Sequence, residues 1–522
     1  MSNRQKSLLV AIFLIAVILR FIPGPRTIDD AYITYRYARN ILAGNGFVYN
    51  PGEHVLGTTT PLYTILLAIL GLFLGGITAP FPQIALVLNA LADGITCVFL
   101  VKLGKSLGFA WAGWGSALVW AVAPYSVTFA IGGLETSLFV LLLVATTWLY
   151  LQKMYPLAAF TASFSFLTRP DSLIFLGPLA LDFLWLKVKE NQGWFISLIK
   201  NHSVQKSSLT FGLPIAVWLT FATLYFGDPF PHSIAAKTVA YRLPENAALI
   251  RLIQHFATPF MEQDTLGIHW IWVGLFLYPF LSLLGIRRAI IANSRAWPFI
   301  VYPWLYFTTF AIANPLIFRW YLTPPLPAYI LSIFIGLESM LLHSFSKFHF
   351  FNYKKINRIF SFVLIIGFPL IFSIKNWTLQ PDHGLNHPAP KMAWYQLELL
   401  YRESANILAP EIMKNQQPVL LAAGDVGVLG YYTNAVILDT VGLNSPQSIK
   451  YYPLDPTYYS TNYAVPPDLI LDTRPDYVVI MEVYGRNGLL KSKVFQENYS
   501  LIKIIPTDIY DSQGMLIFKR LK

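Results

Sequence analysis

Long apolar runs separated by short polar connectors fill the first 375 residues of this 522-residue chain. A membrane-crossing helix needs about 20 mostly apolar residues; some of these runs reach that length and others are shorter. The pattern predicts helical segments at about 8–22, 61–78, 83–101, 109–128, 133–151, 155–168, 171–187, 209–226, 268–285, 296–313, 318–341 and 359–375. The expected fold class is therefore a polytopic α-helical membrane protein.

The remainder of the chain has a different pattern. Apolar residues recur at helical spacing over 391–413, which predicts one helix. Short apolar runs bounded by turn residues then predict strands at 419–423, 436–439, 477–482, 501–505 and 515–518. Strands combined with helix predict a small α/β domain that is too polar to span a membrane. We therefore divide the chain into a transmembrane module, 1–375, and an α/β domain, 376–522.

The composition agrees with a membrane protein. Hydrophobic residues make up 55% of the chain and charged residues 12%, about half of the charged share in a typical soluble domain. These values exclude a conventional cytosolic enzyme and a disordered scaffold. The single cysteine, Cys97, excludes a disulfide-stapled secreted domain.

The net charge of +11 is unevenly distributed along the chain. Residues 376–522 contain 12 Lys/Arg and 14 Asp/Glu, a net charge of −2, so residues 1–375 carry +13. Lysine and arginine favour the cytoplasmic side of membrane spans. The basic connectors that can all be cytoplasmic are Arg4/Lys6, Lys102/Lys105, Lys153, Lys187 to Lys206, Arg287/Arg288/Arg295 and Lys347 to Arg358. The surplus is therefore an orientation signal rather than a sign of nucleic-acid binding.

This orientation predicts a cell (cytoplasmic) membrane protein with its N-terminus inside. Two long loops, 23–60 and 227–265, and the α/β domain are then extracytoplasmic. Inside and outside connectors alternate along the whole chain only if 61–78 is a juxtamembrane or re-entrant element. This leaves about 11 spans. No small-x-small cleavage site follows residues 1–22, so we expect them to be an uncleaved first span.

The first outer loop contains the most informative residues. Asp29 and Asp30 immediately precede a helical segment at about 31–43. A structural interpretation is that one of them caps this helix. Two adjacent like charges beside a membrane span favour a functional interpretation instead, because one cap suffices.

Basic and aromatic residues continue the same helix. Arg36 returns to the face of Asp29 almost two turns later, with Tyr32 between them. Arg39 extends this polar stripe. A helix lying on the membrane, with acids at one end and arginines behind them, predicts an anionic, lipid-linked substrate.

Other charged residues near the ends of spans are expected on the same side, and charges at such places usually mark function. They are Glu135, Arg169, Asp171, His232, Lys237 and Arg319. Each has a structural alternative, such as an ion pair between Arg169 and Asp171, but their convergence predicts a site. We expect Asp93, Asp182 and Glu338 to be structural.

The chain contains no P-loop, no GxGxxG after a strand and no HExxH, so we expect no nucleotide cofactor. The glycine-rich segment GDVGVLG at 424–430 is expected to be a packing element rather than a phosphate cradle. His383 and His387 lie in a Pro/Gly loop that is unsuited to helical metal-ligand geometry.

The segment TIDDAYITYRYARNILAGNGFVYNPGEHVLGTTTPLY resembles the first outer loop of bacterial class C (GT-C) glycosyltransferases that use polyprenyl-phosphate sugars. It is most similar to the arabinofuranosyltransferase- and mannosyltransferase-like group. GGLETSLF, LTRPDS and GDVGVLGYYTNAVILDTVGLNSP are also similar to that group. The group has a seven-span module with a large first outer loop and a second large loop after span seven, where 227–265 lies.

The resemblance implies transfer of a sugar from a polyprenyl-phosphate donor to an extracytoplasmic glycan, lipid or protein by inverting displacement. Asp29 or Asp30 would be the general base. The candidate donor-phosphate ligands are Arg36, Arg39, Arg169, Lys237 and Arg319; the candidate substrate-binding residues are Tyr32, Glu135, Asp171 and His232. A divalent cation (Mg, Mn or Ca) is a candidate cofactor, with Asp30, Glu135 and His232 as its candidate ligands.

Two other classes of function compete with this interpretation. A polytopic lipid or sugar transporter or flippase would also have many spans and buried charges, but it would be expected to show paired broken helices in matching halves. A catalytically silent member would bind glycan through its α/β domain. Sugar transfer unchanged by Asp29→Asn and Asp30→Asn would favour these alternatives.

Overall fold

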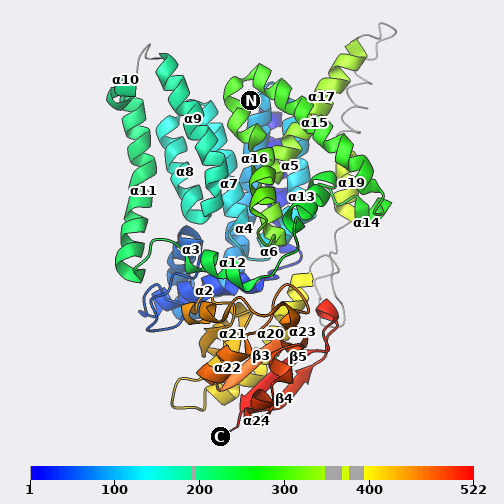
Figure 1. Ribbon diagram of the computed structural model, residues 1–522. Helices are drawn as coiled ribbons and strands as arrows, with labels where there is room; N and C mark the ends of the chain where they lie inside the picture. Colours follow the sequence, from blue (N-terminus) through cyan, green and yellow to red (C-terminus); the bar gives the residue numbers. More distant parts are fainter. Residues whose placement is uncertain (1, 191–194, 347–366, 376–392, 522) are drawn as a thin grey trace.

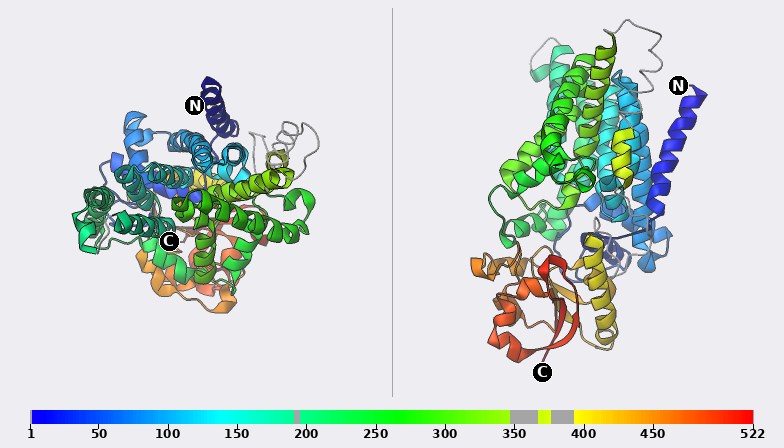
Figure 2. Two further views of the ribbon diagram at one scale, coloured as in Figure 1. Left: turned by 90° about the horizontal axis from the view of Figure 1, so that it is seen from above. Right: turned by 90° about the vertical axis from the view of Figure 1, so that its right-hand side faces the viewer.

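The computed structural model describes residues 2–190, 195–346, 367–375 and 393–521. It shows a long helical bundle with a compact α/β domain at one end (Figure 1). The N-terminus lies at the end of the bundle away from that domain (Figures 1 and 2). The basic connector 347–358, most of the predicted span 359–375, the boundary at 375/376 and the loop with His383 and His387 lie outside the described residues.

Each predicted span within the described residues coincides with a helix or a helix pair. The bundle consists of α1 (Asn3–Phe21), α4 (Phe81–Ser106), α5 (Ala110–Val122), α6 (Pro124–Ile131), α7 (Thr136–Leu151), α8 (Tyr155–Thr168), α9 (Leu173–Glu190), α10 (Phe195–Lys200), α11 (His202–Phe226), α15 (Trp270–Ala292), α16 (Trp297–Ala313), α17 (Leu326–Ser346) and α19 (Phe368–Lys375). Short 3₁₀ turns precede α9, α16 and α17: η2 (Pro170–Ser172), η3 (Ser294–Ala296) and η4 (Arg319–Leu322).

Among the described residues, five helical stretches are long and apolar enough to cross a membrane: Phe81–Ser106, His202–Phe226, Trp270–Ala292, Ser294–Ala313 and Arg319–Leu341. The pair α5 and α6, bent by 47° at its break, gives a sixth if it forms one span. The chain is therefore a polytopic membrane protein, whereas the count of 11 spans stays a prediction.

The segment 61–78 forms a short helix, α3 (Pro61–Phe73), followed by the turn η1 (Gly76–Thr78). At 1.5 Å per residue α3 is about 20 Å long, short of the hydrocarbon core of a bilayer. Its C-terminal end exposes Leu72 and Phe73, while its other faces pack on α2 (Asp29–Leu42) and α4. This geometry suits the predicted juxtamembrane element.

The α/β domain contains all five predicted strands: β1 (Leu420–Ala423), β2 (Val436–Asp439), β3 (Tyr477–Met481), β4 (Tyr499–Ile505) and β5 (Met515–Arg520). They form one sheet in the order β2-β1-β3-β5-β4, with β1 parallel to β2 and β3, and β5 antiparallel to β3 and β4. Helices α20 (Ala393–Ile412), α21 (Gly427–Thr433), α22 (Pro467–Thr473), α23 (Glu482–Gly485) and α24 (Lys493–Asn498) complete the domain with the turns η6 (Pro446–Tyr451), η7 (Pro456–Tyr458), η8 (Leu489–Lys491) and η9 (Ile509–Asp511).

The place where the bundle meets the α/β domain, called the junction below, is built from both predicted outer loops (Figures 1 and 2). The first loop contributes α2 and the second α12 (His232–Ala240), which is followed by α13 (Ala247–Ala257) and α14 (Gln263–Leu266). Ile33, Tyr37 and Tyr49 of the first loop belong to the same hydrophobic cluster as Leu429 and Ile437 of the α/β domain. The first outer loop therefore packs as part of that domain's core.

The three acids expected to be structural have structural partners. Asp93 on α4 pairs with Arg20 on α1 at 2.8 Å and also accepts bonds from Trp120 and Ser137. Asp182 accepts bonds from the Tyr150 hydroxyl and the Trp297 indole, and Glu338 accepts the Ala112 backbone N–H.

The Arg20–Asp93 pair is fully buried, so replacing either residue alone should leave the other as a buried charge without a partner. We expect Arg20→Met or Asp93→Leu to lower the free energy of unfolding by about 3–5 kcal/mol, and the double replacement to recover most of that loss. Thermal unfolding of the detergent-solubilised proteins measures this difference. Single variants as stable as the parent protein would contradict it.

Candidate functional site

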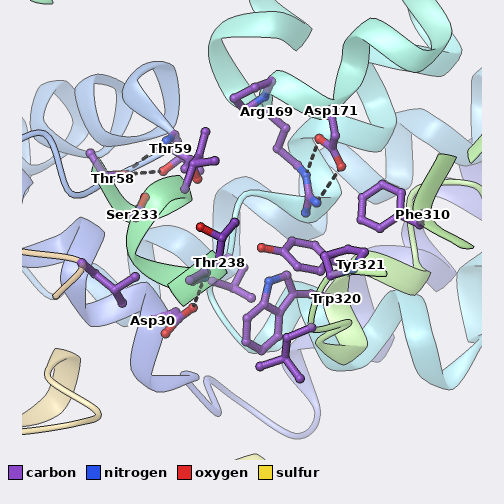
Figure 3. A pocket seen from close by; sticks show the side chains of 18 of the residues that line it. Asp30, Thr58, Thr59, Arg169, Asp171, Ser233, Thr238, Phe310, Trp320 and Tyr321 are labelled. Atoms are coloured by element: carbon purple, nitrogen blue, oxygen red, sulfur yellow. Dashed lines mark hydrogen bonds and ion pairs between the residues drawn. The ribbon is translucent and has the colours of Figure 1, made fainter. Parts of the chain in front are cut away.

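A cavity of about 680 Å³ lies at the junction. Five of the sequence-predicted residues line it together: Asp30, Glu135, Arg169, Asp171 and Lys237. They come from α2, the start of α7, the turn after α8, and α12. Figure 3 shows the Arg169–Asp171 pair beside Trp320 and Tyr321, with Thr58, Thr59 and Ser233 on the opposite side of the view.

Arg169 is held by two carboxylates. It follows the last residue of α8 in an extended conformation. Its Nε and Nη2 donate to the two oxygens of Asp171 at 3.0 and 2.8 Å, and its Nη1 lies 3.4 Å from Glu135 Oε1. The guanidinium also packs over the rings of Phe139 and Tyr321. The sequence-predicted Arg169–Asp171 ion pair is therefore present, and Glu135 joins it within the cavity.

Asp30 faces Lys237 across the cavity. The Lys237 Nζ lies 3.9 Å from Asp30 Oδ2, and the two side chains are 26% and 33% exposed. Burial alone would lower the pKa of Lys237, but the neighbouring Tyr321 hydroxyl and the Asp30 carboxylate outweigh it and raise the pKa. Lys237 is thus a cation with a loose, partly exposed partner, unlike Arg169.

Asp29 points to the other side of α2, because consecutive helical residues are about 100° apart around the axis. Its Oδ2 accepts the N–H of Gly427 and its Oδ1 the N–H of Val428, both at 2.8 Å. Asp29 is 5% exposed and does not line the 680 Å³ cavity. Only Asp30 of the adjacent pair faces the cavity.

Arg36 and Arg39, predicted to bind the donor phosphate, instead contact the α/β domain and its neighbourhood. Arg36 does share the face of Asp29, but that face contacts the α/β domain. Arg36 donates to the backbone oxygens of Tyr49 and Ala435 at 2.8 and 2.7 Å. Arg39 donates to the Tyr431 backbone oxygen and the Asn434 side chain at 2.8 and 2.7 Å. Neither arginine lines the cavity.

Tyr32, His232 and Arg319 also do not line the cavity. The hydroxyl of Tyr32 lies 3.2 Å from that of Tyr432 in the α/β domain, so the expected substrate contact is replaced by a domain contact. The backbone N–H of His232 donates to the Leu56 carbonyl, which joins the two outer loops. Arg319 opens η4, whose next two residues are cavity-lining aromatics.

The expected metal ligands are not gathered. The described residues contain no group of three or more His, Cys, Asp or Glu side chains placed to hold a metal ion. Asp30 instead faces Lys237, and Glu135 faces Arg169. This donor set therefore does not fit a metal site, while a requirement for a divalent cation stays a prediction.

Several lining residues were missed by sequence reasoning. Seven lining serines and threonines carry hydroxyl groups: Thr34, Thr58, Thr59, Thr60, Ser233, Thr238 and Thr309. The Thr58 and Thr60 hydroxyls bond to one another at 3.0 Å. The run of three threonines before a Pro-initiated helix was a visible signal, but single hydroxyl residues are too common to stand out.

The α/β domain adds acids next to Asp29. A second cavity of about 30 Å³ is lined by Asp29, Asp30, Glu398 and Asp425 among others, which is room for a water molecule. Glu398 Oε1 accepts the Asp29 backbone N–H at 2.9 Å, whereas its buried Oε2 has no hydrogen-bond partner among the described residues. Burial, reinforced by Asp425, raises the pKa of Asp29, and burial raises the pKa of Asp425 to about 6.

Comparisons with known proteins agree with the sequence resemblance. Residues 393–518 match a family described as "Domain of unknown function (DUF8728)". The chain is 34% identical over 160 residues to the terminal beta-(1->2)-arabinofuranosyltransferase of Mycobacterium tuberculosis (strain ATCC 25618 / H37Rv). That match covers 29% of this chain and 24% of the relative, so it spans about a quarter of the relative's length.

Solved structures are similar over nearly the whole chain. ArnT from Cupriavidus metallidurans bound to undecaprenyl phosphate is 12% identical, with a TM-score of 0.52 and coverage of 99% of this chain and 98% of that one. The oligosaccharyltransferase AglB from Archaeoglobus fulgidus, in complex with an inhibitory peptide and a dolichol-phosphate, is 12% identical, with a TM-score of 0.53 and coverage of 96% and 73%. The chain thus shares the fold of these solved structures, and part of its sequence is similar to an arabinofuranosyltransferase, in agreement with the resemblance drawn from its motifs.

The junction acids make stability depend on pH. The pKa of Asp425 is raised from 3.8 to about 6, so its stabilising contribution is full below its ordinary value and is lost as pH rises through about 6. Asp425→Asn keeps an oxygen to accept the Tyr401 hydroxyl bond. We expect this variant to be more stable than the parent at pH 7, by about 2–3 kcal/mol, and no more stable at pH 4.

Thermal unfolding followed by tryptophan fluorescence between pH 4 and pH 8 measures this difference. The exposed Asp468→Asn is the control, because it removes a carboxylate of the same domain outside the junction. Parallel pH curves for the parent and Asp425→Asn would contradict the prediction.

Proposed function

We propose that this protein is a membrane glycosyltransferase that moves a sugar from a polyprenyl-phosphate donor to an acceptor outside the cytoplasmic membrane. The observation that carries the proposal is one cavity that brings Asp30 together with Lys237 and Arg169. A carboxylate for the acceptor and cations for a phosphate are the groups that this transfer needs. The class C fold and the arabinofuranosyltransferase relative support the same reaction.

The reaction is a single displacement with inversion at the anomeric carbon. The acceptor oxygen attacks that carbon, and its proton passes to the Asp30 carboxylate as the new C–O bond forms. The bond from the anomeric carbon to the phosphate oxygen breaks, and its electron pair leaves with the polyprenyl phosphate. Lys237 and Arg169 stabilise the negative charge that develops there.

Lys237 is the better placed of the two cations for this role. Its ammonium has a carboxylate partner only at 3.9 Å, whereas Arg169 already donates to both oxygens of Asp171. Part of the role of Arg169 is then to hold the carboxylates of Asp171 and Glu135 in position. The hydroxyl groups around Thr58 and Thr59 suit sugar hydroxyl groups, and Trp320 and Tyr321 offer faces for a sugar ring or the first prenyl units.

The finer assignments belong to the same proposal. The donor sugar is a pentose or hexose, in keeping with the arabinofuranosyltransferase relative. The acceptor is a glycan, lipid or protein of the cell envelope. The junction and the α/β domain lie outside the cytoplasmic membrane, where such acceptors are found, and the N-terminus lies inside.

Release of polyprenyl phosphate from a panel of polyprenyl-phosphate sugars, incubated with the purified full-length protein, tests the function. We expect Asp30→Asn to lower turnover by about 10²–10⁴-fold, because the acceptor loses its general base. Glu245→Gln is the matched control, since it removes an exposed carboxylate from the second outer loop. If the parent protein released no polyprenyl phosphate from any donor in a broad panel, the proposed function would be wrong. Full turnover by Asp30→Asn would show that Asp30 is not the general base.

Lys237 provides a separate test of the phosphate site. We expect Lys237→Gln to lower turnover by about 10²-fold, because one preplaced donor at the leaving group is lost. Lys237→Arg keeps the positive charge and should retain most of the activity. Equal rates for the parent and the Gln variant would exclude Lys237 from the reaction.

A further inference from the structure

The first outer loop is tied to the α/β domain by hydrogen bonds and by close packing. The Asp29 carboxylate accepts the first two N–H groups available in α21, from Gly427 and Val428. These bonds lie in the segment 424–430, which the sequence presents as a packing element. The free N–H groups of this glycine-rich segment therefore bind the Asp29 carboxyl group of the same chain, not a phosphate.

The second tie joins the loop to β2, the edge strand of the sheet. The amide of Asn50 donates to the Ile437 carbonyl at 2.9 Å and accepts the Ile437 N–H at 3.0 Å. Arg36 adds a bond to the Ala435 carbonyl at 2.7 Å. A side-chain amide thereby pairs with the strand as a neighbouring strand would, and it covers that part of the edge.

The third tie is the close approach of the first outer loop to the backbone of α21. A Cβ at Gly427 would overlap the Asp29 carbonyl, and one at Gly430 would overlap the ends of Tyr49 and Arg36. The hydroxyl of Tyr49 also donates to the Val426 carbonyl at 2.7 Å. Glycine is therefore required at both places for the loop to approach α21 as it does.

These ties bear on Asp30, which is the next residue after Asp29. Asp30 itself contacts Lys237 only at 3.9 Å, whereas Asp29 is bonded twice at 2.8 Å. Because both residues lie in the first turn of α2, holding Asp29 sets the rotation of that turn. The rotation decides whether the Asp30 carboxylate faces the cavity.

We infer that the α/β domain, through residues 424–444, is a clamp for the first outer loop, and that Asp29 is a positioning residue that aims Asp30 at the acceptor. This role rests on the proposed function, and it gives the domain of unknown function a task in that reaction. The donor-phosphate residues Lys237 and Arg169 lie outside the clamped loop.

Three measurements on the full-length protein test the clamp: kcat, the KM for the donor, and the rate of amide hydrogen–deuterium exchange. Asp29→Ala should lower kcat by about 10–10²-fold, because a small misplacement of a reacting group is enough for such a loss. The KM for the donor should change less than kcat, since Lys237 and Arg169 belong to other elements than the clamped loop. Hydrogen–deuterium exchange of amides 29–57 should become faster. Asn50→Ala should act in the same direction through the separate tie at β2.

A disulfide can replace the lost tie. A Cβ at Gly57 would lie 2.9 Å from Cγ of Asn444, close to the separation of about 3 Å between a Cβ and the partner sulfur in a disulfide. It would also lie 2.9 Å from the Leu443 carbonyl oxygen, so a small backbone shift accompanies the replacement. Cys97 is buried and is the single native cysteine, so the pair Gly57→Cys/Asn444→Cys should oxidise selectively. The cysteine pair with Asp29 intact is the reference, because any loss of activity caused by the two cysteine replacements is already present in it.

Oxidation of the triple variant with Asp29→Ala should restore most of the kcat of the reference pair and slow the exchange of residues 29–57, and reduction should reverse both effects. Two results would overturn the clamp: unchanged kcat and exchange in Asp29→Ala, or a formed disulfide without recovery. The last result would mean that Asp29 takes part in the chemistry directly. In each case sugar transfer by the parent protein keeps the proposed function standing.

Discussion

The structure of the junction depends on the bonds between the Asp29 carboxylate and the N–H groups of Gly427 and Val428. They join a loop near the start of the chain to a helix almost 400 residues later. Because the carboxylate is buried, its desolvation must be offset by these bonds, and they form only when the α/β domain is docked. The shape of the cavity therefore depends on the docking of that domain onto the first outer loop.

The charges around the cavity follow from the same constraint. Among the described lining residues, Asp30, Glu135 and Asp171 face Arg169 and Lys237, so the acids outnumber the cations by one. Under the proposed function, an anionic donor would add to this excess and compete with Asp30 for Lys237. The proposal would then give one lysine two partners, the donor phosphate and the carboxylate of the base.

Much of the fold could be predicted from periodicity. The five strands of the α/β domain are short apolar runs between turn residues, and each appears where the pattern places it. The helix after Asp29 and Asp30 was also expected, including the shared face of Asp29 and Arg36. The sequence could not predict what this face contacts. Helical spacing shows which residues share a face, whereas only tertiary packing determines which part of the protein covers that face. For this reason Arg36 and Arg39, which bind carbonyls of the α/β domain, resembled phosphate ligands.

The number and closeness of their partners separate the Arg20–Asp93 pair from the Asp30–Lys237 pair more clearly than residue type does. Arg20 and Asp93 are fully buried, with short bonds to each other and to other partners. Such a saturated pair has no capacity left for a substrate. Asp30 and Lys237 are partly exposed and meet at 3.9 Å, so each can exchange its partner at little cost. A charge that must change partners during a reaction has to be held loosely, and the rigid contacts that aim it have to come from its neighbours. In this chain the loose carboxylate is Asp30, and the neighbour that is held rigidly is Asp29.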